Sequence, residues 1–203
     1  MQNNPLAILV MIGVSAYVIR LWFADRKSAG SGTPNRKALP GITSAPLLAH
    51  VIGAVGALLI VLAETKGEIW LGVSGEQSTM TWLFAAYTLL AAFVEEIIFR
   101  GFLVVTRRGA AVRWASAVLA SILFAALHPF LWDWKEDTLV WHFDTKGWFS
   151  FGAVFVTSLW FYVVRFARFN PAWSLAPCFT AHVTKNAAVV AIKLLQGHLV
   201  GLY

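Results

Sequence analysis

The sequence predicts an all-α membrane protein, a polytopic bundle of about six transmembrane helices. Of its 203 residues, 59% are hydrophobic and only 13% are charged, whereas soluble domains carry about 25% charged residues. The apolar residues also form long blocks instead of alternating with polar ones, which is typical of helices that cross a bilayer. A single cysteine, Cys178, excludes an internal disulfide framework.

The apolar blocks place the six helices at about 5–23, 45–63, 79–106, 111–131, 149–166 and 171–195. The first block follows an N-terminus without Lys or Arg, so we expect a retained helix and not a cleaved signal peptide, which begins with basic residues. The segment 28–38 is rich in Gly, Ser, Pro and basic residues and is expected to be a flexible loop. No internal repeat is present.

The loops between these helices alternate in charge. The odd loops are basic, with Arg20, Arg26, Lys27, Arg36 and Lys37, then Arg107, Arg108 and Arg113, then Arg165 and Arg168; the even loops are acidic, with Glu64, Glu68 and Glu76, then Asp133, Glu136, Asp137 and Asp144. Because basic loops stay on the cytoplasmic side, both termini are expected to be non-cytoplasmic. The net charge of +6 therefore indicates membrane orientation and not nucleic-acid binding.

The fourth loop, 131–148, also contains four tryptophans, Trp132, Trp134, Trp141 and Trp148. Tryptophans at the edge of a membrane protein are typical of an interfacial belt. A flap that contacts substrate is the alternative interpretation.

The third predicted helix contains Glu95, Glu96 and Arg100 within an apolar run. A charge near the middle of a spanning helix costs roughly 2.5–3.5 kcal/mol, so three of them require partners or a function. Glu96 and Arg100 are four residues apart on one face, which predicts an ion pair. Adjacent residues on a helix point about 100° apart, so Glu95 is expected to face elsewhere.

Polar side chains also lie in the fourth and sixth predicted helices: His128, and the pair His182 and Asn186, which are four residues apart on one face. Counted inward from the basic loops at 1.5 Å per residue, these three residues and Glu95 lie roughly 17–22 Å deep, within about one helical turn of each other. A carboxylate and an imidazole in a poorly hydrated site can activate water. A second imidazole and an amide can donate to an oxyanion.

Three motifs at these residues, Glu95-Glu96-x-x-x-Arg100, Phe124-x-x-x-His128 and His182-x-x-x-Asn186, resemble the CPBP family of CAAX-protease and bacteriocin-processing (Abi) intramembrane endopeptidases. Type II CAAX prenyl endopeptidase and lysostaphin-resistance-like proteins are related members. The resemblance covers about 80–195. It departs from the family at Lys185, where a small or apolar residue is usual; the sequence leaves open whether Lys185 pairs with Glu96 or faces a polar cavity.

The resemblance implies a glutamic intramembrane protease that needs no cofactor. In it, Glu95 and His128 activate a water, His182 and Asn186 stabilise the oxyanion, and Glu96 and Arg100 support the site. Its substrate would be a membrane-embedded or membrane-anchored protein or peptide in the lipid bilayer. We expect a single domain over 1–203, with two helices that carry no motif in 1–78 and a four-helix catalytic core in 79–195. The family and the compact chain together suggest a prokaryotic plasma membrane.

Several alternatives accompany this hypothesis. Glu, His, His and Asn could hold a metal within the same activity, since carboxylate and imidazole are ordinary zinc ligands, although no His-Glu-x-x-His is present. The polar cluster could instead belong to a transporter or to a non-catalytic immunity or binding protein.

Gly72-Val73-Ser74-Gly75 matches the short Gly-x-Ser-Gly pattern of rhomboid-type proteases but lies in a charged loop. Cys178 precedes His182 by four residues and is expected to pack, and His50 is expected to be a hydrogen-bonded core histidine.

Overall fold

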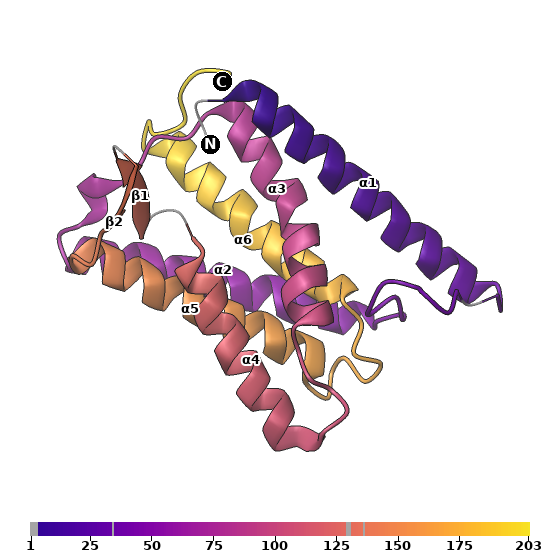
Figure 1. Cartoon of the computed structure of the whole chain (residues 1–203). Helices are drawn as coiled ribbons and strands as arrows, with labels where there is room; N and C mark the ends of the chain where they lie inside the picture. The colour runs from indigo at the N-terminus through magenta and orange to yellow at the C-terminus, as the bar shows by residue number, and fades with distance from the viewer. Residues whose placement is uncertain (1–3, 34, 129–130, 136) are drawn as a thin grey trace.

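The computed structural model describes residues 4–33, 35–128, 131–135 and 137–203. In that part of the chain the α-helices are α1 (Pro5–Gly30), α2 (Leu47–Trp70), α3 (Trp82–Glu96), α4 (Gly109–Ala126), α5 (Thr145–Phe166) and α6 (Ala176–Leu195). The predicted all-α bundle is confirmed (Figure 1). By length and composition, α1, α2, α4, α5 and the segment Trp82–Phe102 could each cross a membrane. The more polar α6 is not among them.

The polar helix α6 is surrounded by other helices: it contacts α2, α3 and α5. Helix α1 packs along α3, and α4 packs against α5 (Figure 1). This arrangement explains how α6 carries His182, Lys185 and Asn186 within a membrane protein, because its neighbours shield these side chains from lipid.

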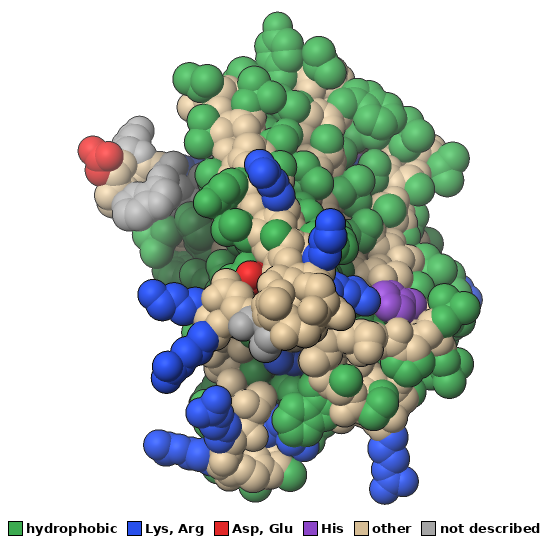
Figure 2. Space-filling model, turned by 90° about the vertical axis from the view of Figure 1, so that its right-hand side faces the viewer, with side chains coloured by type: hydrophobic (Ala, Val, Ile, Leu, Met, Phe, Trp, Pro, Cys, Tyr) green, Lys and Arg blue, Asp and Glu red, His purple; other side chains and the backbone are tan. Residues whose placement is uncertain are grey.

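The connections gather at two opposite ends of the bundle. At one end the loop after α1 meets the loop before α6, since the Thr43 hydroxyl donates to the Ala172 carbonyl (2.9 Å) and the Leu175 amide donates to the Gly41 carbonyl (2.9 Å). Figure 2 looks towards this side of the molecule and shows Lys and Arg side chains gathered on it. At the opposite end, the Met80 amide donates to the His198 carbonyl (2.8 Å). The odd and even loops are thus separated in space, as their charges predict.

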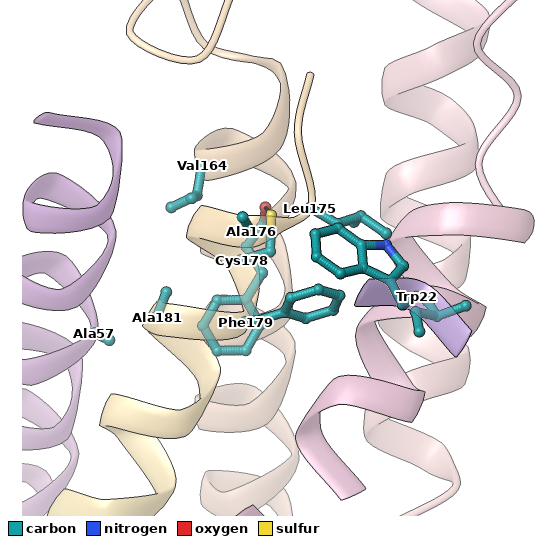
Figure 3. Close-up of a cluster of buried hydrophobic side chains, with 10 residues drawn as sticks. Trp22, Ala57, Val164, Leu175, Ala176, Cys178, Phe179 and Ala181 are labelled. Carbon is teal, nitrogen blue, oxygen red and sulfur yellow. Dashed lines mark hydrogen bonds between the residues drawn. The ribbon is translucent and has the colours of Figure 1, made fainter. Parts of the chain in front are cut away.

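A buried apolar cluster sets the position of the first turns of α6. The ring of Phe179 meets the edge of Trp22 on α1, with ring centroids 4.9 Å apart (Figure 3). The Trp22 indole also donates to the Pro40 carbonyl (3.0 Å). Ala57 of α2 and Val164 of α5 belong to the same cluster. Because Phe179 lies one turn before His182, this packing fixes which way the imidazole of α6 points.

The fourth helix ends five residues earlier than predicted, because α4 ends at Ala126 and not at 131. His128 therefore lies in a bend beyond the helix. Residue 129 is proline, and the residue before a proline is disfavoured in the α conformation.

The fourth loop contains a hairpin that the sequence did not predict. Strands β1 (Trp132–Lys135) and β2 (Thr138–Trp141) pair antiparallel. The rings of Trp141, Phe143 and Trp148 stack on one another and are exposed, an arrangement that suits an interfacial belt, although the belt and the flap both stay predictions. Pro129, Phe130 and Glu136 lie outside the described residues, as does the side chain of Trp134.

Helices α2 and α5 approach closely at two glycines of α2. The Trp160 indole donates to the Gly53 carbonyl (3.1 Å), and a Cβ added at Gly56 would lie 2.1 Å from Cζ2 of Trp160. Small residues at a helix interface allow such approach in membrane proteins. Glycine at 56 is therefore required for this contact.

We predict that Gly56→Ala lowers the free energy of unfolding by about 1–3 kcal/mol, because the new methyl group overpacks the Trp160 ring. The matched control is Gly152→Ala in α5, where nothing lies within 4 Å of the added Cβ and the helix propensity of alanine is favourable. Unfolding in detergent micelles, followed by tryptophan fluorescence, measures both. Equal stability of the two variants would contradict the packing described.

Candidate active site

The buried ion pair between Glu96 and Arg100 forms the base of the site. Both side chains are 0% exposed, and Arg100 Nη1 lies 3.1 Å from Glu96 Oε1, so the predicted ion pair is confirmed. Arg100 Nη2 also donates to the hydroxyl (2.8 Å) and the carbonyl oxygen (3.2 Å) of Ser158 on α5. The guanidinium carbon lies over the rings of Phe124, Phe161 and Tyr162 at 4.6, 5.1 and 5.1 Å. The pair therefore ties α3, α4 and α5 together.

Arg100 lies in a π-helical segment, η2 (Ile97–Phe102), that directly follows Glu96. Such widened turns are rare and recur at functional sites. Gly101 faces the loop after α1 here: a Cβ at this position would lie 2.4 Å from Cγ of Pro40. No periodic pattern of residues indicates the π-helix, and only this glycine marks the close approach of the loop.

His182 lies between the two adjacent glutamates. Its Nδ1 is 2.8 Å from Glu96 Oε1, and its Nε2 is 3.6 Å from Glu95 Oε2. The ring stacks on Phe161 of α5, with centroids 4.7 Å apart. Arg100 pairs with Glu96, and the neighbouring Glu95 points elsewhere on α3, as expected. The sequence did not predict that a single imidazole approaches both carboxylates.

The two contacts of His182 differ in kind. The Glu96 contact has hydrogen-bond length, whereas 3.6 Å exceeds the range of a direct hydrogen bond. Glu96 is also fully buried, while the side chain of Glu95 is 33% exposed. Glu96 thus fixes the orientation of the ring, and Glu95 remains close to Nε2 and accessible from outside the protein interior.

His128 reaches the same region from the end of α4. Its Nδ1 is 2.7 Å from the Phe124 carbonyl oxygen. Because a carbonyl only accepts, Nδ1 carries the hydrogen and Nε2 is the basic nitrogen of the neutral ring. The ring of Phe124 lies 4.7 Å from His128 and 6.1 Å from His182, measured between centroids. Phe124, the first residue of the second motif, therefore contacts both imidazoles.

Asn186 lies one turn further along α6 than His182 and faces α3, as the four-residue spacing predicts. Its Nδ2 donates to the carbonyl oxygen of Thr88 (3.0 Å). Thr88 lies about two turns before Glu95 on α3. Among the described contacts, Glu95, Glu96, Arg100 and His182 are joined directly, whereas Asn186 contacts α3 at Thr88 and not at the glutamates. The catalytic roles of these residues stay predictions.

The remaining residues singled out from the sequence have other partners. Lys185 Nζ lies 3.6 Å from Glu64 Oε2 of α2, so it pairs with neither Glu96 nor a residue of α3. His50 Nδ1 hydrogen-bonds the Thr180 hydroxyl (2.7 Å), as expected for a core histidine. The Cys178 thiol donates to the Phe161 carbonyl (3.4 Å). Ser74 begins a 3₁₀ turn beyond α2, outside the helices.

The metal-dependent alternative requires several ligand side chains that converge on one point. Within the described ranges, no group of three or more His, Cys, Asp and Glu side chains is arranged to hold a metal ion.

The fold and the cluster together define a polytopic helical membrane protein with ionisable side chains buried inside its bundle. Residues 77–188 match the family model described as type II CAAX prenyl endopeptidase Rce1-like, which is more than half of the chain. The chain belongs to this protease family. The match covers α3, α4 and α5 and extends into α6 beyond Asn186. No curated protein and no solved structure matches the chain.

We predict that the same substitution lowers the free energy of unfolding by very different amounts at the two adjacent glutamates. Glu96→Gln leaves Arg100 charged and unpaired in the interior, which costs about 3–5 kcal/mol of unfolding free energy. Glu95→Gln removes a partly exposed carboxylate and costs less than about 1 kcal/mol. Thermal and denaturant unfolding of the purified variants measures the difference. A larger loss for Glu95→Gln than for Glu96→Gln would contradict the assignment of Glu96 as the structural carboxylate.

Proposed function

We propose that this protein is an intramembrane endopeptidase that hydrolyses a peptide bond in a membrane-embedded or membrane-anchored protein. The observation that carries the proposal is the position of Glu95: a partly exposed carboxylate lies 3.6 Å from the Nε2 atom of a buried, oriented imidazole. Membership of a protease family supports it. Hydrolysis by this pair needs a water molecule, which can reach Glu95 because its side chain is partly exposed.

In the proposed mechanism Glu95 is the general base, with His128 beside the same water. Glu95 accepts a proton from the water, and the hydroxide oxygen bonds to the carbonyl carbon of the scissile peptide, whose C=O π electrons move to the oxygen. His128 suits an assisting role because its Nε2 has a lone pair when Nδ1 donates to the Phe124 carbonyl. The abstracted proton, held meanwhile by Glu95 or His182, finally passes to the leaving nitrogen as the oxyanion re-forms the C=O bond and the C–N bond breaks.

His182 and Asn186 are the proposed oxyanion donors. Nε2 of His182 can donate only when it carries a hydrogen, which the adjacent Glu95 can supply after it has taken the proton from the water. The resulting imidazolium would be stabilised through Nδ1 by the Glu96 carboxylate, 2.8 Å away. The Asn186 amide has two N–H groups and uses one for the Thr88 carbonyl, so the second can donate to the oxyanion.

We also propose that the basic end of the bundle faces the cytoplasm and that both termini face the other side. The gathering of the Lys and Arg side chains of the odd loops at one end of the bundle (Figure 2) supports this orientation. The prokaryotic plasma membrane stays a prediction from the sequence.

We predict that Glu95→Gln abolishes proteolysis, lowering kcat by about 10²–10⁴-fold, because a neutral amide cannot accept the proton. Asn186→Ala should lower kcat by about 10²–10³-fold through loss of an oxyanion donor. The measurement is a comparison of new protein termini by mass spectrometry in membranes that contain wild type or Glu95→Gln at matched levels. Peptides that span the cut sites then serve for kinetics.

The control is His198→Gln, which replaces a histidine in the segment after α6 and should retain wild-type activity. Termini that appear with wild type and His198→Gln, but not with Glu95→Gln, support the proposal. Identical termini with all three folded proteins would refute it and favour the binding or transport alternatives. Inhibition by a chelator that is reversed by Zn²⁺ would favour the metal-dependent alternative.

A further inference from the structure

Lys185 is a cation next to the proposed catalytic side chains. It lies between His182 and Asn186 on α6, and its side chain is 13% exposed. A lysine has a flexible four-carbon stem. The ammonium group of Lys185 can therefore move if its partner is removed.

The partner of Lys185 comes from outside the family-matched segment. Glu64 lies on α2, before residue 77 where the match begins, and its side chain is 20% exposed. Its Oε2 is buried and accepts no hydrogen bond from any described side chain or backbone group. The ion pair with Lys185, at 3.6 Å, is therefore the contact that neutralises the charge of the Glu64 carboxylate.

Other charges along the α2–α6 contact are already paired. Glu68 pairs with Lys146 and accepts from Gln77, and Lys193 donates to Gln77 and to the Ser78 carbonyl. A small cavity of about 60 Å³ lies here and is lined by Glu64, Glu68, Gln77 and Lys193 among others. Glu68 of α2 already pairs with Lys146. Glu64 is therefore the carboxylate on this face of α2 that pairs with Lys185.

We propose that Glu64 is a positioning residue that holds Lys185 away from Glu95. This inference rests on the proposed function of Glu95 as the general base. If Lys185 swung to Glu95, the resulting ion pair would stabilise the ionised carboxylate and make it a weaker proton acceptor. Helix α2 thus contributes to the site although it carries no family motif.

The kinetic test uses peptides that span the mapped cut site. Glu64→Gln should lower kcat about tenfold with little change in KM, because an unpaired Lys185 pairs with Glu95. Glu64→Gln with Lys185→Gln should restore activity to near the wild-type value, and Lys185→Gln alone should remain near it. Glu68→Gln, one turn along the same face of α2, is the matched control and should stay near wild type. All variants are compared below the temperature at which any of them unfolds.

The second test needs no activity. Wild type and Glu64→Gln are treated in membranes with a membrane-permeant carbodiimide, which joins a lysine to a carboxylate in contact, and the linked peptides are identified by mass spectrometry. Wild type should give the Lys185–Glu64 link. Glu64→Gln should give a Lys185–Glu95 link instead.

The two tests separate the inference from the proposed function. Wild-type proteolysis with no rescue in the double variant, or with no Lys185–Glu95 link in Glu64→Gln, would overturn the positioning role alone. Loss of activity in Lys185→Gln comparable to that in Glu64→Gln would also overturn it, since Lys185 would then be needed itself. No proteolysis by wild type would refute the proposed function, and the inference would fall with it.

Discussion

The structure depends on one buried ion pair, Glu96 with Arg100. Taking two charges out of water costs several kcal/mol per ion, and their attraction offsets this only when hydrogen bonds and geometry are good. Here Ser158 accepts from the guanidinium, and three aromatic rings surround it. These partners come from α4 and α5, while the pair itself comes from α3 and the π-helical segment. The helices must therefore keep their relative positions for the charges to remain inside.

The same pair organises the groups that face the proposed substrate. Glu96 uses the oxygen beside Arg100 to hold Nδ1 of His182, which turns Nε2 towards Glu95. The buried cluster around Phe179 and Trp22 fixes α6 from the other side (Figure 3). A rigid interior thus positions a more exposed carboxylate. Accuracy in a catalytic geometry generally depends on such supporting contacts.

The features that could be predicted from the sequence are those that follow from helix geometry. The spacing of Glu96 and Arg100 predicted their ion pair, and the spacing of His182 and Asn186 predicted that both face one neighbour. Features that need tertiary contacts could not be predicted. They include the imidazole that spans both glutamates, the π-helical turn at Arg100, and the Lys185–Glu64 pair, whose members are far apart in the chain. The end of α4 before His128 could have been inferred from the proline at 129.

The geometry of the site depends on Glu96, which orients His182 so that its other nitrogen faces Glu95. Nitrogen NMR of histidine-labelled protein in lipid bilayers tests it directly, because the chain has five histidines and His182→Gln assigns the signals. We expect Glu96→Gln to shift the Nδ1 resonance of His182 and Glu95→Gln to shift mainly its Nε2 resonance. Resonances of His182 that respond to neither substitution would contradict it.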